Sequence, residues 1–88
     1  MDQGPVEIPI TDSLDLHPFR PDEVRDVALE YLTVARERGM KQVRLIHGRG
    51  IGMQRANVQV MLRRLEWVED FWDDASLGAT VVVLRTED

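Results

Sequence analysis

The chain has 88 residues, of which 43% are apolar, 31% charged and 6% aromatic, and it has no cysteine and a formal net charge of -5. This length predicts one small domain, and this composition a folded globular protein rather than a disordered or fibrous one. The sequence shows neither an apolar run long enough to span a bilayer nor a signal peptide, so we expect a cytoplasmic protein without a membrane partner. Without cysteine, disulfides and thiolate metal ligands are excluded.

The net negative charge conceals an uneven distribution of basic residues. Eight of the 11 lysines and arginines lie between Arg36 and Arg64 beside one acid, Glu37, so this segment carries +7 and the remainder -12. Such asymmetry predicts a polarised surface and an anionic partner such as DNA or RNA, because Lys and Arg neutralise phosphates. Solvated helix faces explain the same pattern equally well.

The first half of the chain predicts an arm, a strand and a helix. Residues 1–12 hold two of the four prolines, and we expect a flexible arm whose Val6 to Ile10 segment can pair with a sheet. Leu14 to His17 is predicted to form a short strand, and the domain proper to span residues 13–88. Pro21 suits the first turn of the following helix. That helix has a complete apolar stripe and is predicted to stop at Gly39: Val24, Val27, Ala28, Tyr31, Leu32 and Ala35.

The second half predicts two further strands around a second helix, and then a last strand. Lys41 to His47 contains enough branched residues for a buried strand. The next helix follows three alternating glycines and repeats apolar residues at helical spacing: Val58, Met61, Leu62 and Leu65. Trp67 to Trp72 predicts an exposed edge strand, and Ala79 to Arg85 a central one. The resulting β-α-β-α-β-β pattern predicts an α/β two-layer sandwich, with a mixed four-stranded sheet and both helices on one face.

Each of the two histidines closes one of the first two predicted strands. If these strands are parallel, His17 and His47 emerge at the same carboxyl edge, which is where open α/β folds bind their ligands. Asp15 lies two residues before His17 and therefore on the same side of its strand, where a carboxylate can orient an imidazole or join it in holding a cation. An isolated Asp-x-His is more often an exposed polar pair at a strand end.

Alternating glycines follow His47 in the sequence Gly48-Arg49-Gly50-Ile51-Gly52. Glycines here permit positive φ angles and close backbone approach, so a phosphate can rest against the helix N-terminus with Arg49 as its counter-charge. Arg44 and Arg55, from the same basic segment, are further expected phosphate contacts. The spacing is neither a dinucleotide fingerprint nor a P-loop. A tight structural turn is the alternative explanation for the glycines.

The two histidine motifs, Leu14-Asp15-Leu16-His17 and His47-Gly48-Arg49-Gly50, resemble the LDxH and HGxG motifs of the small MutS-related (Smr) domain family. The resemblance extends from about Ser13 to Arg85. It implies a sandwich like the C-terminal domain of the bacterial third translation initiation factor, and binding or nicking of DNA or RNA. By the motif match, Asp15 and His17 take the place of the family's acid and first histidine, and His47, Gly48 and Gly50 that of its glycine loop.

Two positions depart from the family pattern. Pro18 stands where many members have Gly, which stiffens the first loop, and Ile51 stands where Thr is common, which removes a hydroxyl near the expected phosphate.

Two functions are consistent with these features. The first is a nucleic-acid-binding domain with endonuclease activity on branched or structured DNA or RNA, in which His17 or His47 moves a proton. In it Asp15 orients His17, or the two help to hold a divalent metal such as Mg²⁺. The second is a non-catalytic module that binds nucleic acid or a protein.

Overall fold

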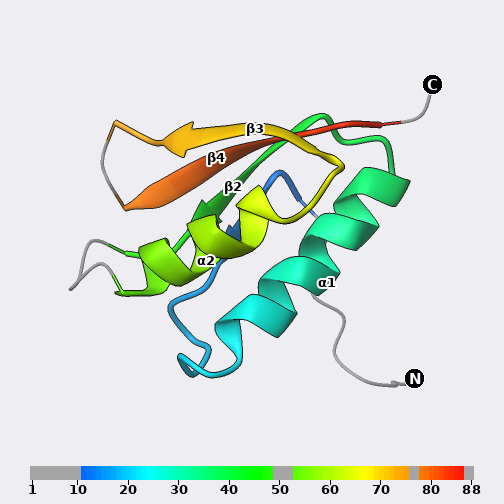
Figure 1. Ribbon diagram of the computed structural model, residues 1–88. Helices are drawn as coiled ribbons and strands as arrows, with labels where there is room; N and C mark the ends of the chain where they lie inside the picture. The colour runs from blue at the N-terminus through cyan, green and yellow to red at the C-terminus, as the bar shows by residue number, and fades with distance from the viewer. Residues whose placement is uncertain (1–10, 49–52, 76–77, 87–88) are drawn as a thin grey trace, which may run out of the picture.

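The computed structural model describes residues 11–48, 53–75 and 78–86 of the chain. Its elements follow the predicted order: β1 (Ser13–Asp15), α1 (Val24–Glu37), β2 (Gln42–Ile46), α2 (Met53–Arg63), β3 (Val68–Asp73) and β4 (Ala79–Leu84). The four strands form one sheet in the order β1-β2-β4-β3, with β1 parallel to β2 and β4 antiparallel to both of its neighbours. Both helices lie side by side on one face of this sheet (Figure 1). The predicted mixed α/β fold is therefore confirmed.

The apolar stripe of α1 forms the centre of the core. Val24, Ala28, Tyr31, Leu32 and Ala35 are buried against residues of the sheet. The helix begins three residues later than Pro21, which lies in the preceding turn, so the predicted place of Pro21 in the first helical turn was wrong. It ends as predicted, because Gly39 adopts a φ of 80° and the Met40 amide donates to the Ala35 carbonyl at 3.0 Å.

Strand β4 occupies a central position and β3 an edge, as the sequence predicts. Val82 and Leu84 pack toward the helices with Val43 and Leu45 of β2, and five of the six β4 residues are buried. In contrast, β3 exposes Glu69 and Asp70, charges that discourage edge-to-edge pairing.

Trp67 lies just before this edge strand, and Trp72 lies within it. Trp67 packs against the core with the Arg36 guanidinium 5.5 Å from its ring centre, whereas Trp72 is exposed on β3. Packing therefore accounts for Trp67.

Strand β1 is shorter than predicted. It ends at Asp15, although the Leu16 amide still donates to the Ile46 carbonyl at 2.8 Å, and His17 lies beyond the strand. Thr11 and Asp12, which the sequence assigns to the arm, are held by the domain: the Tyr31 hydroxyl donates to the Thr11 carbonyl, and the Arg44 amide donates to the Asp12 carbonyl. Residues 1–10, with the predicted pairing of Val6 to Ile10, lie outside the described residues.

The topology brings six ends of helices and strands to one end of the sheet, which we call the site edge. The carboxyl ends of β1, β2 and β3, the start of β4 and the amino ends of both helices all lie there (Figure 1). Among the described residues, no helix has the length and apolar character needed to cross a bilayer.

Candidate nucleic-acid site

His17 and Asp15 form an exposed hydrogen-bonded pair at the site edge. Asp15 Oδ1 accepts from His17 Nδ1 at 2.7 Å and from the His17 amide at 2.9 Å. The amide and the imidazole together hold the pKa of Asp15 below its usual value. Because a carboxylate can only accept, the neutral His17 ring carries its proton on Nδ1 and its lone pair on Nε2. The side chain of His17 is 59% exposed, so a ligand can reach it.

The His17 ring rests against the backbone of Gly48. A Cβ atom built at Gly48 would lie closer to His17 Nε2 than real Cβ contacts allow, and 3.1 and 3.3 Å from Cδ2 and Cε1. Gly48 also has a φ of 83°, which glycine adopts without strain. The first glycine of the HGxG motif is thus in contact with the histidine of the LDxH motif.

His47 occupies a different environment from His17, although both lie at the site edge. It is buried, with only 6% of its surface exposed, and both of its ring nitrogens have partners. Nδ1 donates to the Gly48 carbonyl at 2.9 Å, and Nε2 lies 2.9 Å from the Thr80 hydroxyl, which donates to it in this tautomer. The imidazole of His47 therefore ties β2 to β4 and fixes the carbonyl of Gly48.

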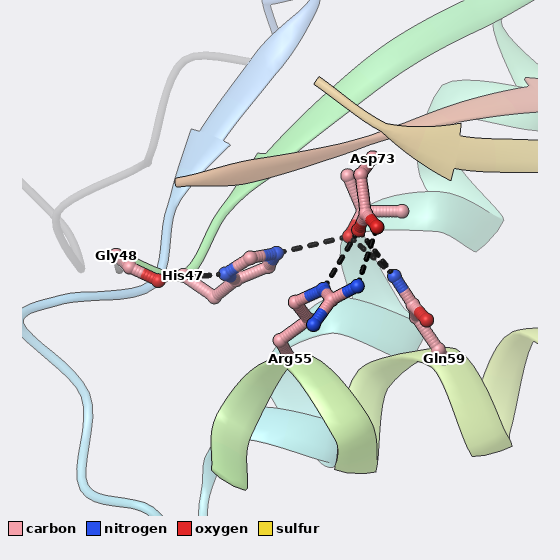
Figure 2. Close-up of polar contacts among 6 residues, drawn as sticks. His47, Gly48, Arg55, Gln59 and Asp73 are labelled. Carbon is pink, nitrogen blue, oxygen red and sulfur yellow. Dashed lines mark hydrogen bonds and ion pairs between the residues drawn. The ribbon is translucent and has the colours of Figure 1, made fainter. Parts of the chain in front are cut away.

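A polar network continues from His47 to the first turns of α2 (Figure 2). Asp73, at the end of β3, accepts from Arg55 Nε at 2.7 Å and from Gln59 Nε2 at 2.8 Å, and it forms a second contact with the Arg55 guanidinium. Gln59 Nε2 also lies 3.4 Å from the Thr80 hydroxyl. The hydrogen bonds from Arg55, and secondarily from Gln59, hold the pKa of Asp73 below its usual value. This network joins α2, β3 and β4 at the site edge.

Two of the expected phosphate contacts are engaged with carboxylates. Arg55 forms the two-pronged ion pair with Asp73, and Arg44 Nη2 lies 3.2 Å from Asp74 Oδ2. Neither guanidinium therefore presents an uncompensated charge to a phosphate. Of the remaining expected contacts, Gly48 lies at the site edge, whereas Arg49, Gly50 and Gly52 lie outside the described residues.

Three residues of the network were not singled out from the sequence, namely Gln59, Asp73 and Thr80. Thr80 had a detectable signal, because it is the one hydroxyl residue in the apolar run from Ala79 to Leu84 and a buried hydroxyl requires a partner. Gln59 and Asp73 had none, since polar residues on a helix and on an edge strand are ordinary.

The described residues contain no group of three or more His, Asp or Glu side chains arranged to hold a metal ion. Asp15 offers one carboxylate oxygen that His17 does not use, and the Nδ1 of His17 is directed at Asp15. This donor set fits a hard ion such as Mg²⁺, which prefers oxygen and can be held by one carboxylate together with water and substrate oxygens.

An α/β sandwich with an Asp-x-His motif and a His-Gly loop in contact at one sheet edge defines a recognisable class of small domain. The model of the family described as "Smr domain" matches residues 14–85. The chain therefore belongs to the Smr domain family.

Similar proteins support this assignment. The chain is 35% identical over 75 residues to a protein of Gemmatimonas aurantiaca named endonuclease MutS2, a match covering 81% of this chain and 9% of that protein. It is 38% identical over 80 residues to the Thermus thermophilus protein of the same name, covering 72% of this chain and 11% of that protein. The chain thus spans about a tenth of the length of these relatives.

Solved structures of Smr domains share the fold. The crystal structure of the Smr domain of Thermus thermophilus MutS2 has a TM-score of 0.80 and 34% identity, covering 85% of this chain and 99% of that one. YdaL, a stand-alone small MutS-related protein from Escherichia coli, has a TM-score of 0.79 and 25% identity, covering 85% of this chain and 65% of that one.

Proposed function

We propose that this chain binds DNA or RNA at the site edge and cleaves a phosphodiester bond there, with His17 as the residue that moves the proton. The observation that carries the proposal is the exposed Asp15–His17 pair in contact with Gly48. The MutS2 relatives are named as endonucleases, which supports the same class of reaction for this chain.

The geometry of His17 suits a general base. Asp15 holds the proton on Nδ1, so Nε2 accepts a proton from an attacking water or hydroxyl group. That oxygen forms the new bond to phosphorus, and the bond to the leaving sugar oxygen breaks in line with it. The leaving oxygen takes the electron pair of the broken bond and is protonated by solvent or by the imidazolium of His17.

His47 has a supporting role in this proposal. Both of its ring nitrogens already have partners within the protein, and its side chain is buried. It therefore holds the Gly48 carbonyl and the end of β2 in place rather than exchanging a proton with substrate. The sequence offers either His17 or His47 as the residue that moves a proton, and we assign this role to His17.

A divalent ion is an optional part of the proposal. If Mg²⁺ takes part, Asp15 supplies its one protein oxygen, and the ion neutralises charge on the phosphate. His17 contributes to such a site only by orienting Asp15.

The test is a binding and cleavage panel on the purified chain, with supercoiled plasmid, branched DNA, single-stranded DNA and structured RNA, each in Mg²⁺ and in EDTA. His17→Ala should retain binding and lose cleavage by about 10² to 10⁴-fold, as is typical for removal of a general base. Asp15→Asn should also reduce cleavage. Asp22→Asn is the matched control, because Asp22 is similarly exposed near the site edge but pairs with Arg20 instead of a histidine.

Cleavage at the wild-type rate in His17→Ala would refute the assignment of the base. Binding without cleavage by the wild-type chain on every substrate would refute the nuclease and leave a non-catalytic module. Absence of nucleic-acid binding, with capture of a protein partner, would refute both.

A further inference from the structure

We infer that Gly48 is a positioning residue for His17, because its bare Cα provides the space in which the imidazole ring rests. Its importance for cleavage rests on the proposed role of His17 as general base, whereas the contact between Gly48 and the His17 ring does not depend on that role. Gly48, the first glycine of the HGxG motif, then positions His17 of the LDxH motif, in addition to any contact that the glycine loop makes with phosphate.

The His17 ring is held from two directions. On one side, Asp15 Oδ1 accepts from Nδ1 at 2.7 Å. On the other, the ring lies over Gly48, where a Cβ would overlap Nε2 and lie within 3.1 Å of Cδ2. A carboxylate alone leaves an exposed ring free to rotate about the shared hydrogen bond. The backbone of Gly48, which lies against Nε2, Cδ2 and Cε1, restricts that rotation.

The backbone of Gly48 cannot easily withdraw to make room for a side chain. Its amide donates to the Gly78 carbonyl at 2.9 Å, and its carbonyl accepts from His47 Nδ1 at 2.9 Å. His47 is in turn buried and bonded to Thr80. The exposed side chain of His17 is the part that can move. A methyl group at position 48 should therefore displace the ring from Asp15 while the fold persists.

This arrangement links the two histidines through a single residue. The ring of His17 contacts the Cα of Gly48, and the ring of His47 bonds its carbonyl. Thr80 bonds His47, His47 bonds Gly48, and Gly48 contacts His17. A substitution at Thr80 or His47 should therefore change the position of the His17 ring.

The chain supplies a matched control for the backbone. Gly39 has a φ of 80°, close to the 83° of Gly48, but a Cβ there would meet nothing within 4 Å. Alanine at either position forces a left-handed conformation of similar cost. Only alanine at position 48 also meets an imidazole. The difference between the two variants isolates the contact with His17.

The experiment compares wild type, Gly48→Ala and Gly39→Ala by long-range ¹H–¹⁵N NMR of the histidine rings, without nucleic acid. Wild type and Gly39→Ala should show the Nδ1–H tautomer of His17 imposed by Asp15. Gly48→Ala should lose it and show the averaged pattern of a free imidazole. In a cleavage assay the same displacement should cost about 10²-fold, the size expected for a reacting group misplaced by about 1 Å. His17 signals that are unchanged in Gly48→Ala, or changed equally in Gly39→Ala, would overturn the inference.

A double variant keeps the inference falsifiable if Gly48→Ala folds poorly. With the ring removed by His17→Ala, the stabilities of Gly48→Ala and Gly39→Ala in urea should become equal. If Gly48→Ala remains the more damaging change, or still does not fold, another contact is responsible and the inference fails. The NMR measurement of the His17 ring requires no substrate. A wild-type chain that cleaves nothing would therefore refute the proposed function, while the NMR comparison would still decide whether Gly48 positions His17.

Discussion

His17 and His47 follow adjacent parallel strands and yet differ in nearly every physical respect. His17 is 59% exposed and shares one ring nitrogen with Asp15, whereas His47 is 6% exposed and uses both nitrogens within the protein. An exposed imidazole with one ring nitrogen not bonded within the protein suits proton transfer, while a buried and fully bonded imidazole suits structural support. Two histidines at one sheet edge are therefore not two equivalent catalytic groups.

The difference arises from the alternation of side chains along each strand. Along β1 and the two residues that follow it, Leu14 and Leu16 are buried in the core, so Asp15 and His17 point away from it. In β2, Val43 and Leu45 point into the core, and His47 continues their alternation toward the helices. A shift of one residue relative to the inward positions thus separates an exposed histidine from a buried one.

The largest expected effect on stability comes from removing the buried imidazole. His47→Ala should lower the free energy of unfolding by about 2 to 4 kcal/mol, because it leaves a cavity and deprives the Thr80 hydroxyl of a partner. His17→Ala, at an exposed position, should change it by no more than about 0.5 kcal/mol. Urea unfolding followed by circular dichroism measures both. Equal losses would break the distinction between the two histidines.

A smaller effect should follow from removing the hydroxyl that bonds His47. Thr80→Val keeps the shape of a side chain with no exposed surface and leaves His47 Nε2 without its donor, at a cost of about 1 to 2 kcal/mol. Thr33→Val is the control, since the Thr33 hydroxyl bonds the Leu29 carbonyl on the exposed face of α1. If the two variants lose the same stability, the Thr80 hydroxyl does not support His47.

The smallest effect concerns the exposed pair and appears only in acid. The hydrogen bonds from His17 lower the folded-state pKa of Asp15 from 3.8, so the charged carboxylate favours folding. That contribution is present above pH 3.8 and is lost as the pH falls through the lowered folded value. The difference in unfolding free energy between wild type and Asp15→Asn should therefore shrink between pH 6 and pH 3. A difference independent of pH would show that the pair contributes nothing through charge.

Glu30→Gln is the control for this titration. Glu30 is exposed in the middle of α1, and its side chain forms no hydrogen bond or ion pair with other described residues. Because the Glu30 side chain has no such partner, Glu30→Gln should change the free energy of unfolding by no more than about 0.5 kcal/mol.

The fold was predictable from the sequence because its signals are local and periodic. The stripe of α1 and the stop at Gly39 depend on the 3.6-residue repeat and on a left-handed cap, and both are properties of a short segment. The central place of β4 followed from its uninterrupted apolar run. The errors lie at boundaries, at Pro21 and at the end of β1, where a turn and a helix or strand compete at little energetic difference.

The charges were less predictable than the fold. The basic segment from Arg36 to Arg64 suggested cations gathered around His47, but β3 brings Asp73 and Asp74 to the same end of the sheet. These carboxylates pair with Arg55 and Arg44, respectively, from positions 18 and 30 residues away in the sequence. A count of charge along the chain cannot include such partners, because strand order decides which segments meet.

By itself, the sequence determined the elements, their order and the two motifs that identify the Smr domain family. These depend on side-chain periodicity and on residue types at short spacing, which each segment carries with it. Only the tertiary structure decided that Gly48 lies between the two imidazoles, that His47 is buried and bonded to Thr80, and that Arg55 is committed to Asp73. The reason is physical: contacts, burial and charge pairing arise where separate segments pack together, and the positions of β1, β3 and β4 around β2 are set by the whole sheet.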